Sequence, residues 1–327
     1  MKRWQWLTLR TAAGVLAAVG LGLAALGQEA VPNEISYIPP TALEQIPDDG
    51  KLRVIVFGAH PDDSEIRAGG TGMMFSKQGH HVKFVSVTNG DIGHWQMAGG
   101  PLAQRRYAEV QAAAGVLGVT TDVLDIHDGE LEPTLENRRK ITRAIRRWQA
   151  DIVIAHRPND YHPDHRYTGV LVQDSAYMVA VPFFCPDTPP VRGNPVFLYS
   201  EDSFERPNPF RADIVVAIDE VVDKKAEALV LMESQFIEGG ALGYLNPYDH
   251  SEEGRAKGRE QAREGFKRRA ARTADRFREK LIELYGEEKG KQVKYAEAFE
   301  ICEYGRRPSK EEIRKLFPFY PEPAAKK

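Results

Sequence analysis

KLRVIVFGAHPDDSE, residues 51–65 of the 327-residue chain, joins a β-branched run to a cluster of polar side chains. The run over residues 51–57 predicts a short buried parallel strand, because such strands are covered on both faces and read as continuous apolar stretches. One histidine and two aspartates follow at residues 60–63, where that strand ends. Residues 65–79 then have helical spacing and end in a glycine suited to a helix terminus. The segment therefore predicts a strand, a polar loop and a helix in succession.

The same alternation of strand and helix continues along the chain. Further strands are predicted over residues 81–88, 122–126, 151–155, 196–199 and 213–218. Helices are predicted over residues 101–118, 135–149, 165–180 and 220–236. This alternation predicts the α/β class, with a doubly wound, mostly parallel sheet and helices on both faces. Ligands in such sheets bind beyond the carboxyl ends of the strands, so the residues that follow each strand are the candidates for function.

The two ends of the chain differ in composition from its middle. Residues 1–27 combine a basic start with an uncharged apolar run of about 16 residues, shorter than the about 20 that a membrane span needs. They predict a secretory signal peptide and a periplasmic or extracellular protein with no stable span after cleavage, an uncleaved anchor being the alternative. Residues 28–50 form an extended lead-in and residues 51–250 the main domain. Residues 251–327, dominated by a long charged helix, are expected to form a helical extension packed on that domain.

Composition and charge exclude several classes of function. Hydrophobic residues make up 42% of the chain and charged residues 28%, as is usual for a globular protein. The formal net charge of −3 gives no global attraction for a nucleic acid, and the basic residues between 255 and 280 are interleaved with acidic ones. Cys185 and Cys302 are too few for a four-thiolate zinc site, so a metal must use histidine and carboxylate ligands. The sequence leaves a disulfide and the oligomeric state open.

A second polar cluster, RPNDYHPDH at residues 157–165, follows the strand predicted at 151–155. In a doubly wound sheet this cluster and the one after the first strand can meet at one edge. His60, Asp63 and His165 then supply two imidazoles and one carboxylate, a standard catalytic zinc set with an open position for water. The spacing of three residues lets one tight turn aim His60 and Asp63 at the same ion. We expect one Zn²⁺, with Fe²⁺ as a possible occupant of the same ligands.

Three further residues of these clusters suit a hydrolytic reaction. Asp62 is expected to point away from the ion and to take a proton from a metal-bound water, whose pKa the ion lowers to about 7. His162 is placed to hydrogen-bond an oxyanion or to protonate a leaving amine. Asp164 is expected to hold His162 in one tautomer, as carboxylates near metal ligands often do.

The same residues admit other interpretations. Aspartates at strand ends often only cap the next helix, although two His-Pro-Asp units, each after a strand, are hard to explain as caps. Two histidines and one carboxylate also form the facial triad of non-haem iron oxygenases, which usually occupy a β-barrel. A non-catalytic carbohydrate-binding relic is expected to have lost the base or a ligand, and here all are present. A hydrolase of a non-sugar N-acyl amine or thiol conjugate is the more serious alternative.

Four short motifs carry a resemblance to a known family. They are AHPDDSE at residues 59–65, TNGD at 88–91, RYAE at 106–109 and HPDH at 162–165. Through these motifs the chain resembles the PIG-L/LmbE-like N-acetylglucosamine deacetylases, from about residue 54 to residue 165 and more weakly beyond. The first motif is highly specific. The resemblance implies a Rossmann-like fold and a zinc-dependent deacetylase whose substrate is an amino sugar or glycoconjugate with an N-acetyl group.

The resemblance also implies a role for each metal-site position. His60, Asp63 and His165 match the zinc ligands of the family. Asp62 matches its general base. His162 matches the histidine that assists at the oxyanion and the leaving group.

Two further positions are implied by the same motifs. Asp164 matches the carboxylate that supports the assisting histidine. Arg106 matches an arginine that lies near the substrate, although a simple ion pair with Glu109 would explain it equally well. The predicted export signal and the charged C-terminal region depart from the family pattern, and they favour a cell-wall, glycan or scavenged substrate.

Overall fold

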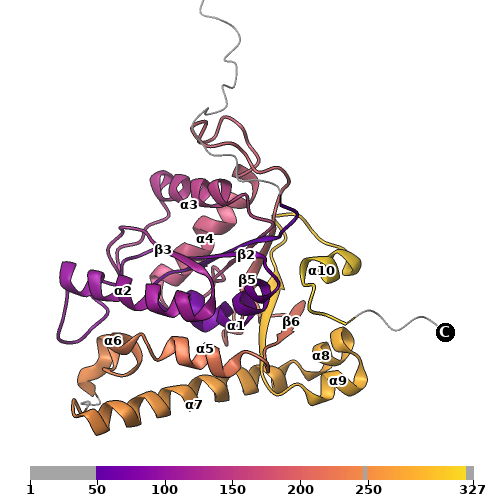
Figure 1. Ribbon diagram of the computed structural model, residues 1–327. Coiled ribbons are helices and arrows are strands. Elements are labelled where there is room, and N and C mark those ends of the chain that lie inside the picture. The colour runs from indigo at the N-terminus through magenta and orange to yellow at the C-terminus, as the bar shows by residue number, and fades with distance from the viewer. Residues whose placement is uncertain (1–48, 246–248, 322–327) are drawn as a thin grey trace, which may run out of the picture. The chain divides into compact units, whose positions relative to one another are not determined.

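The computed structural model describes residues 49–245 and 249–321. The predicted signal peptide, and the predicted lead-in up to residue 48, lie outside the described residues. A seven-stranded sheet with the order β3-β2-β1-β4-β5-β7-β6 forms the centre of the described part (Figure 1). Its strands are β1 (Arg53–Gly58), β2 (His81–Ser86), β3 (Thr120–Val123), β4 (Ile152–Ala155), β5 (Val196–Ser200), β6 (Ile214–Ala217) and β7 (Ala296–Ile301).

The sheet is mostly parallel, as the sequence predicts. β1 pairs in parallel with β2 and β4, and parallel pairing extends to β3 on one side and to β5 on the other. β7 is antiparallel to both of its neighbours, β5 and β6. β3 lies earlier in the chain than predicted, because this edge strand pairs only with β2 and that pairing ends at Ser86 and Val123.

Helices cover both faces of the sheet, which confirms the predicted α/β class. α1 (Asp63–Lys77) and α2 (Gly100–Leu117) lie on one face, and α3 (Leu135–Trp148) and α4 (Pro163–Met178) lie on the other (Figure 1). Each of these helices falls within about two residues of the predicted bounds, since the strand and helix periods of this part of the sequence are strong.

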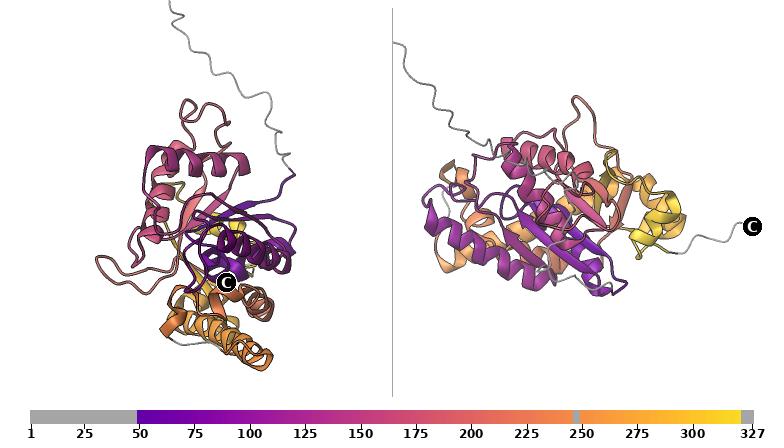
Figure 2. Two further views of the ribbon diagram at one scale, coloured as in Figure 1. Left: turned by 90° about the vertical axis from the view of Figure 1, so that its left-hand side faces the viewer. Right: turned by 90° about the horizontal axis from the view of Figure 1, so that it is seen from above.

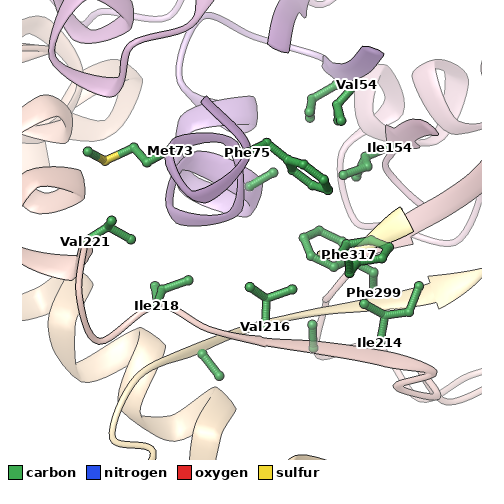
Figure 3. Close-up of a cluster of buried hydrophobic side chains, with 14 of the residues drawn as sticks. Val54, Met73, Phe75, Ile154, Ile214, Val216, Ile218, Val221, Phe299 and Phe317 are labelled. Atoms are coloured by element: carbon green, nitrogen blue, oxygen red, sulfur yellow. The ribbon is translucent and has the colours of Figure 1, made fainter. Parts of the chain in front are cut away.

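The sheet divides the hydrophobic core into two clusters. Val54 and Val56 of β1 pack with residues of α1 and α2, whereas Ile55 and Phe57 pack with residues of α3 and α4. This division follows from the two-residue period of a strand, which sends successive side chains to opposite faces. Figure 3 shows part of the first cluster, where side chains of α1 face those of β6 and β7.

The C-terminal third of the chain supplies the remaining helices. They are α5 (Val222–Leu229), α6 (Glu233–Phe236), the 3-10 helix η1 (Gly240–Leu245), α7 (Glu252–Arg276), α8 (Arg278–Tyr285), α9 (Glu287–Gln292) and α10 (Lys310–Leu316). α5 packs against α1 and α2 on one side and against α7 on the other, as the views in Figures 1 and 2 show.

Two helices that the sequence predicts as continuous are each interrupted. Residues 220–236 form α5 and α6, because the chain leaves helical geometry to bury both Val230 and Met232. The long charged helix predicted within residues 251–327 is divided at Phe277, whose ring packs against Phe210 with centroids 5.7 Å apart. In both places tertiary burial overrides local helix propensity.

The C-terminal region contributes a strand to the sheet and does not only pack on its outside. β7 lies between β5 and β6, and its Glu297 is buried. The Glu297 carboxylate accepts the N–H groups of Gly70 and Thr71 at 2.8 and 2.7 Å and pairs with Lys225 at 2.6 Å. These contacts tie β7 to α1 and α5, so residues 251–321 share the core of the main domain.

The two cysteines lie apart in the structure. Cys185 and Cys302 are both buried and are not joined in a disulfide. The Cys302 sulfur accepts a hydrogen bond from the hydroxyl of Tyr199 at 3.1 Å.

Among residues 49–245 and 249–321, none of the helices has both the length and the apolar character that a membrane span requires.

Candidate metal and active site

The two polar clusters lie where the chain changes direction across the sheet. From β1 the chain proceeds to β2 and β3 on one side and then returns to β4 on the other side of β1. The carboxyl ends of β1 and β4 therefore form a topological switch point, where doubly wound sheets bind ligands. His60 follows β1, and His165 lies in the first turn of α4, which follows β4. Nδ1 of His60 is 3.3 Å from Nε2 of His165, so the predicted convergence of the two loops is present.

Three donor atoms at this point form a nearly equilateral triangle. Oδ2 of Asp63 lies 3.3 Å from Nδ1 of His60 and 3.4 Å from Nε2 of His165. The third side, between the two imidazole nitrogens, is 3.3 Å. Ligand atoms around a tetrahedral Zn²⁺ with bonds of about 2.0–2.1 Å are themselves about 3.3–3.4 Å apart. The spacing of the three donor atoms therefore fits one Zn²⁺ ion, which His60, Asp63 and His165 would hold.

Neighbouring carboxylates set the tautomers of the two histidines. Nε2 of His60 lies 3.1 Å from Oδ1 of Asp128 and 3.3 Å from Oδ2 of Asp164. Nδ1 of His165 lies 3.1 Å from Oδ1 of Asp160. A carboxylate that accepts the N–H of one ring nitrogen leaves the lone pair of the other nitrogen for an ion. His60 thus presents Nδ1 and His165 presents Nε2, which are the two nitrogen atoms of the triangle.

The site carries an excess of carboxylate. Burial acts to lower the pKa of His60, but its contacts with Asp128, Asp164 and Asp63 raise that pKa well above its ordinary value. Burial also acts to lower the pKa of His165, but Asp63, followed by Asp160, raises that pKa above its ordinary value. Positive charge is therefore stabilised here, and the donor set fits a divalent cation.

His156 packs against the proposed ligand His165 and was not predicted. It follows β4 directly, is buried, and stacks on the His165 ring with centroids 4.2 Å apart. Its Nε2 lies 3.3 Å from Oδ2 of Asp63 and accepts the N–H of Ala59 at 3.2 Å. Burial lowers its pKa, so the ring is neutral. Because the Nε2 lone pair is taken by a backbone N–H, His156 is not the best candidate for a ligand, and it supports the His165 ring by stacking on it.

His162 lies beside the triangle with a hydrogen-bond donor to offer. Its ring meets that of His60 edge-on, with centroids 4.6 Å apart. It caps α4, and its Nδ1 accepts the N–H of Asp164 at 3.2 Å. Burial, and then the neighbouring His60 and His165, lower its pKa. A neutral ring whose Nδ1 is an acceptor carries its proton on Nε2, so His162 can donate to a developing oxyanion.

The carboxylate of Asp164 does not hold His162 in its tautomer, and that expectation is wrong. Oδ2 of Asp164 accepts the N–H of Gly129 at 2.7 Å and contacts Nε2 of His60 at 3.3 Å. The reason is geometric, because residues two apart at the start of a helix do not face each other. The backbone N–H of Asp164 sets the tautomer of His162, and its side chain orients His60.

Asp62 has the surroundings of a general base. Its Oδ2 accepts a hydrogen bond of 2.5 Å from Nε2 of Gln235. Burial, followed by the charge of Asp63, raises the pKa of Asp62 to about 6, while Arg106 and His60 oppose the rise. A carboxylate whose pKa approaches the operating pH is well suited to take a proton and to return it.

Gln235 is brought to Asp62 by a helix that no motif marks. It belongs to α6, which is held in place through Glu109 of α2. The Glu109 carboxylate accepts the backbone N–H of Ser234 at 3.0 Å and its hydroxyl at 2.6 Å. Glu109 also pairs with Arg105 at 3.1 Å. The expected alternative for Arg106, an ion pair with Glu109, is therefore wrong.

Arg106 instead points toward the site. It is 1% exposed, and its Nη2 donates to the carbonyl of Gly93 at 2.6 Å. Burial lowers its pKa, and the charge of Asp62 is the largest opposing influence. Its Nε has no hydrogen-bond partner among the described residues. Arg106 is thus a buried guanidinium near Asp62 with one unused N–H donor, which is consistent with the expectation that Arg106 contacts the substrate.

The sequence could have signalled some of the missed residues. Asp128 follows β3 and His156 follows β4, both at the carboxyl edge that the strand pattern already identifies. Asp160 lies within the second polar cluster. Gln235 had no such signal, since it lies far along the chain in a short helix with no recognisable motif.

The chain is similar to several known proteins. The family model described as PIG-L, GlcNAc-PI de-N-acetylase, matches residues 55–176. Diacetylchitobiose deacetylase of Thermococcus kodakarensis is 31% identical over 194 residues, which cover 57% of this chain and 71% of that protein. 4-Oxalmesaconate hydratase of Pseudomonas putida is 27% identical over 189 residues, covering 55% and 73%. The structure of N,N'-diacetylchitobiose deacetylase from Pyrococcus horikoshii superposes with a TM-score of 0.58 at 25% identity, covering 77% of this chain and 84% of that one.

Proposed function

The chain belongs to the PIG-L family of de-N-acetylases, and on that premise we propose that it is a metal-dependent hydrolase that deacetylates an N-acetylglucosamine-type amino sugar or glycoconjugate. The observation that carries the proposal is the triangle of His60, Asp63 and His165 donor atoms with sides of 3.3–3.4 Å. Asp62 lies next to that triangle with a pKa near 6. A cation site beside a free base is the minimum that metal-assisted amide hydrolysis requires.

His60, Asp63 and His165 are the residues that would hold the ion. A divalent ion there supplies Lewis acidity, which polarises the acyl carbonyl and lowers the pKa of a water molecule. Zn²⁺ suits two imidazoles and one carboxylate, and Fe²⁺ can occupy the same set without changing the reaction. Asp128, Asp164 and Asp160 hold the two rings in the required orientation.

The other residues move the protons. Asp62 accepts a proton from the attacking water while the water oxygen bonds to the carbonyl carbon. The Nε2–H of His162 donates to the carbonyl oxygen as negative charge develops on it. When the carbon–nitrogen bond breaks, the proton held by Asp62 passes to the nitrogen, and acetate and a free amine leave. Arg106 holds its positive charge near Asp62 and lowers the pKa of that carboxylate.

Acetate release from a panel of N-acetylated compounds tests this proposal. The panel contains N-acetylglucosamine, chitooligosaccharides, cell-wall fragments and glycolipid analogues. We expect release from at least one amino-sugar compound by the zinc-loaded protein, and loss of release after complete chelation with recovery on adding Zn²⁺. Release that persists in fully metal-free protein would contradict the mechanism. Release only from linear N-acyl amines or thiol conjugates would move the substrate to the alternative class.

A second candidate function is hydration of a carbon–carbon double bond. The observation that favours it is the similarity to 4-oxalmesaconate hydratase over 73% of that protein. A hydratase can use the same arrangement, since a carboxylate that takes a proton from water serves addition as well as hydrolysis. Loss of ultraviolet absorbance from an unsaturated dicarboxylate, with no acetate released from any N-acetyl compound, would favour hydration over deacetylation.

We also propose that the protein is exported. The support is the composition of residues 1–27, a basic start followed by an apolar run too short for a typical membrane span. Expression of the full chain, followed by fractionation and amino-terminal sequencing, tests it. Mature protein that begins near residue 28 outside the cytoplasm is the expected result, and an intact amino terminus in the membrane fraction would favour an uncleaved anchor.

A further inference from the structure

An exposed aromatic side chain stands at the edge of the proposed metal site. Tyr161 is 71% exposed, and its ring centroid lies 5.5 Å from that of His165 and 5.7 Å from that of His162. Its other ring neighbour is Phe204, from the loop after β5, with centroids 6.1 Å apart. Phe204 is itself only partly buried. The two rings form an apolar wall, which we call the aromatic wall, beside a site otherwise lined with charged groups.

The loops that present the two rings are fastened to each other beneath the surface. Arg157 and Asp202 are buried and form a two-pronged ion pair with both N–O distances at 2.7 Å. The Arg157 guanidinium also donates to the carbonyl of Phe204 at 2.7 Å. Asp202 in turn accepts the backbone N–H of Phe204 at 2.9 Å. The carbonyl of Phe204 is therefore bound directly to the loop that carries Tyr161, and its N–H is bound to Asp202, the partner of Arg157 in the ion pair.

The backbone of Tyr161 is fixed as well. Nη1 of Arg166 donates to the carbonyls of Asp160 and Tyr161, each at 3.0 Å. Asp160 is the residue that orients His165, so the position of Tyr161 is coupled to the ligand set. A rigid aromatic surface loses little conformational entropy when a ligand packs on it, which favours binding.

The depth of the site determines which part of a substrate meets this wall. The donor atoms of Asp63 and His165 are buried, so the scissile carbonyl must reach inward to them. An acetyl group has only a methyl beyond its carbonyl and cannot extend back to a rim residue that is 71% exposed. The group at the rim is therefore the one attached to the amide nitrogen. A pyranose ring offers a flat face of C–H groups that suits an aromatic surface, whereas a linear amine does not.

We infer that Tyr161 and Phe204 form a carbohydrate subsite that packs against the apolar face of the pyranose ring bearing the N-acetyl group. The inference rests on the proposed deacetylase function and narrows its substrate class to amino sugars over linear N-acyl amines. Tyr161 acts in it as a substrate-contact residue through its ring, and its hydroxyl is dispensable.

Steady-state kinetics on matched substrates test the subsite. The variants are Tyr161→Ala, Phe204→Ala and Tyr161→Phe. The matched control is Tyr177→Ala, because Tyr177 is 73% exposed and lies near the far end of α4, about 21 Å from the start of that helix at 1.5 Å per residue. For the sugar substrate we expect Tyr161→Ala to raise KM about tenfold with little change in kcat. The conservative variant Tyr161→Phe should bring KM back toward the wild-type value, and the control Tyr177→Ala should leave KM and kcat unchanged. For a linear N-acetylated amine, if the protein turns it over, we expect no change in KM for any variant.

The outcomes separate this inference from the proposed function. Equal losses on the sugar and the linear amine, or a loss in kcat alone, would assign Tyr161 to the support of His162 and His165 and would overturn the subsite. A loss that grows from N-acetyl to N-butyryl sugars would place the acyl chain on the wall and would also overturn it. If the zinc-loaded protein releases no acetate, deacetylation fails, and calorimetric titration with N-acetylglucosamine oligosaccharides decides the subsite. Weaker binding by Tyr161→Ala than by Tyr161→Phe then supports the subsite, and equal binding or none rejects it.

Discussion

Nε2 of Gln235 donates a 2.5 Å hydrogen bond to Oδ2 of Asp62 across 173 residues of sequence. The bond joins α6, a short helix of the C-terminal part, to the loop that follows β1. It stabilises the ionised carboxylate, because an N–H donor favours the charged form of its acceptor. Burial works in the opposite direction and raises the pKa of Asp62 to about 6. The Gln235 hydrogen bond is one of three influences, after the charges of Arg106 and His60, that lower the pKa of Asp62 and so help to set the pH at which the proposed base is available.

Removing that hydrogen bond should move the acid limb of the activity profile. Gln235→Ala deletes an influence that lowers the pKa of Asp62, so the pKa rises and the base is protonated at a higher pH. We expect kcat/KM of the variant to fall relative to wild type more strongly at pH 6 than at pH 8. The measurement is a pH profile of both proteins loaded with the same ion. Gln261→Ala on the exposed face of α7 is the control, and superimposable acid limbs for Gln235→Ala and wild type would contradict the prediction.

Replacing the base itself should separate binding of the ion from turnover. Asp62→Asn keeps the size of the side chain but cannot accept a proton from water. We expect kcat to fall by about 10²–10⁴-fold while the ion content stays that of wild type. Metal analysis and acetate release on the same preparation check both halves. Turnover close to wild type would remove Asp62 from the proposed role, and loss of the ion would assign it to the ligand set.

Glu65 gives a pH-dependent contribution to stability. It is 1% exposed, both carboxyl oxygens are without a hydrogen-bond partner among the described residues, and burial raises its pKa to about 8. Its pKa in the unfolded chain is about 4.3, so the folded state holds the proton more tightly. The stability from the protonated form is fully present below about pH 4.3 and is lost as the pH rises through about 8.

Glu65→Gln should remove this dependence, because glutamine is neutral at every pH. In chelated protein we expect the free energy of unfolding of the variant, relative to wild type, to rise between pH 5 and pH 8 by on the order of 4 kcal/mol. Urea unfolding at several pH values measures the difference. A difference that does not vary with pH would show that Glu65 is already ionised in the folded protein.

The sequence predicts the architecture and the three-atom ligand set because both depend on short-range patterns. The run over residues 51–57 has a strand period, and parallel strands must end at a common edge, so His60 and His165 are brought together by topology alone. The predicted α/β class follows from the same alternation. No side-chain detail is needed for either conclusion.

The missed features depend on packing between segments that are distant in sequence. Gln235 reaches Asp62 only because Glu109 holds the start of α6, and neither residue belongs to a metal motif. β7 enters the sheet between β5 and β6, which no local period can announce. The carboxylate of Asp164 turns to His60 and not to His162, since the geometry of a helix start decides its direction. Tertiary contacts, and not propensity, determine each of these positions.

The ion content of purified variants tests the central claim most directly. The experiment loads each protein with Zn²⁺, desalts it and measures the bound metal by mass spectrometry. The proteins are wild type, Asp62→Asn, His165→Ala and the control His81→Ala, which changes an exposed histidine far from the site. We predict one tightly held ion per chain in wild type, Asp62→Asn and His81→Ala, and loss of that ion in His165→Ala. A full complement of ion with unchanged affinity in His165→Ala, or none in wild type, would contradict the account.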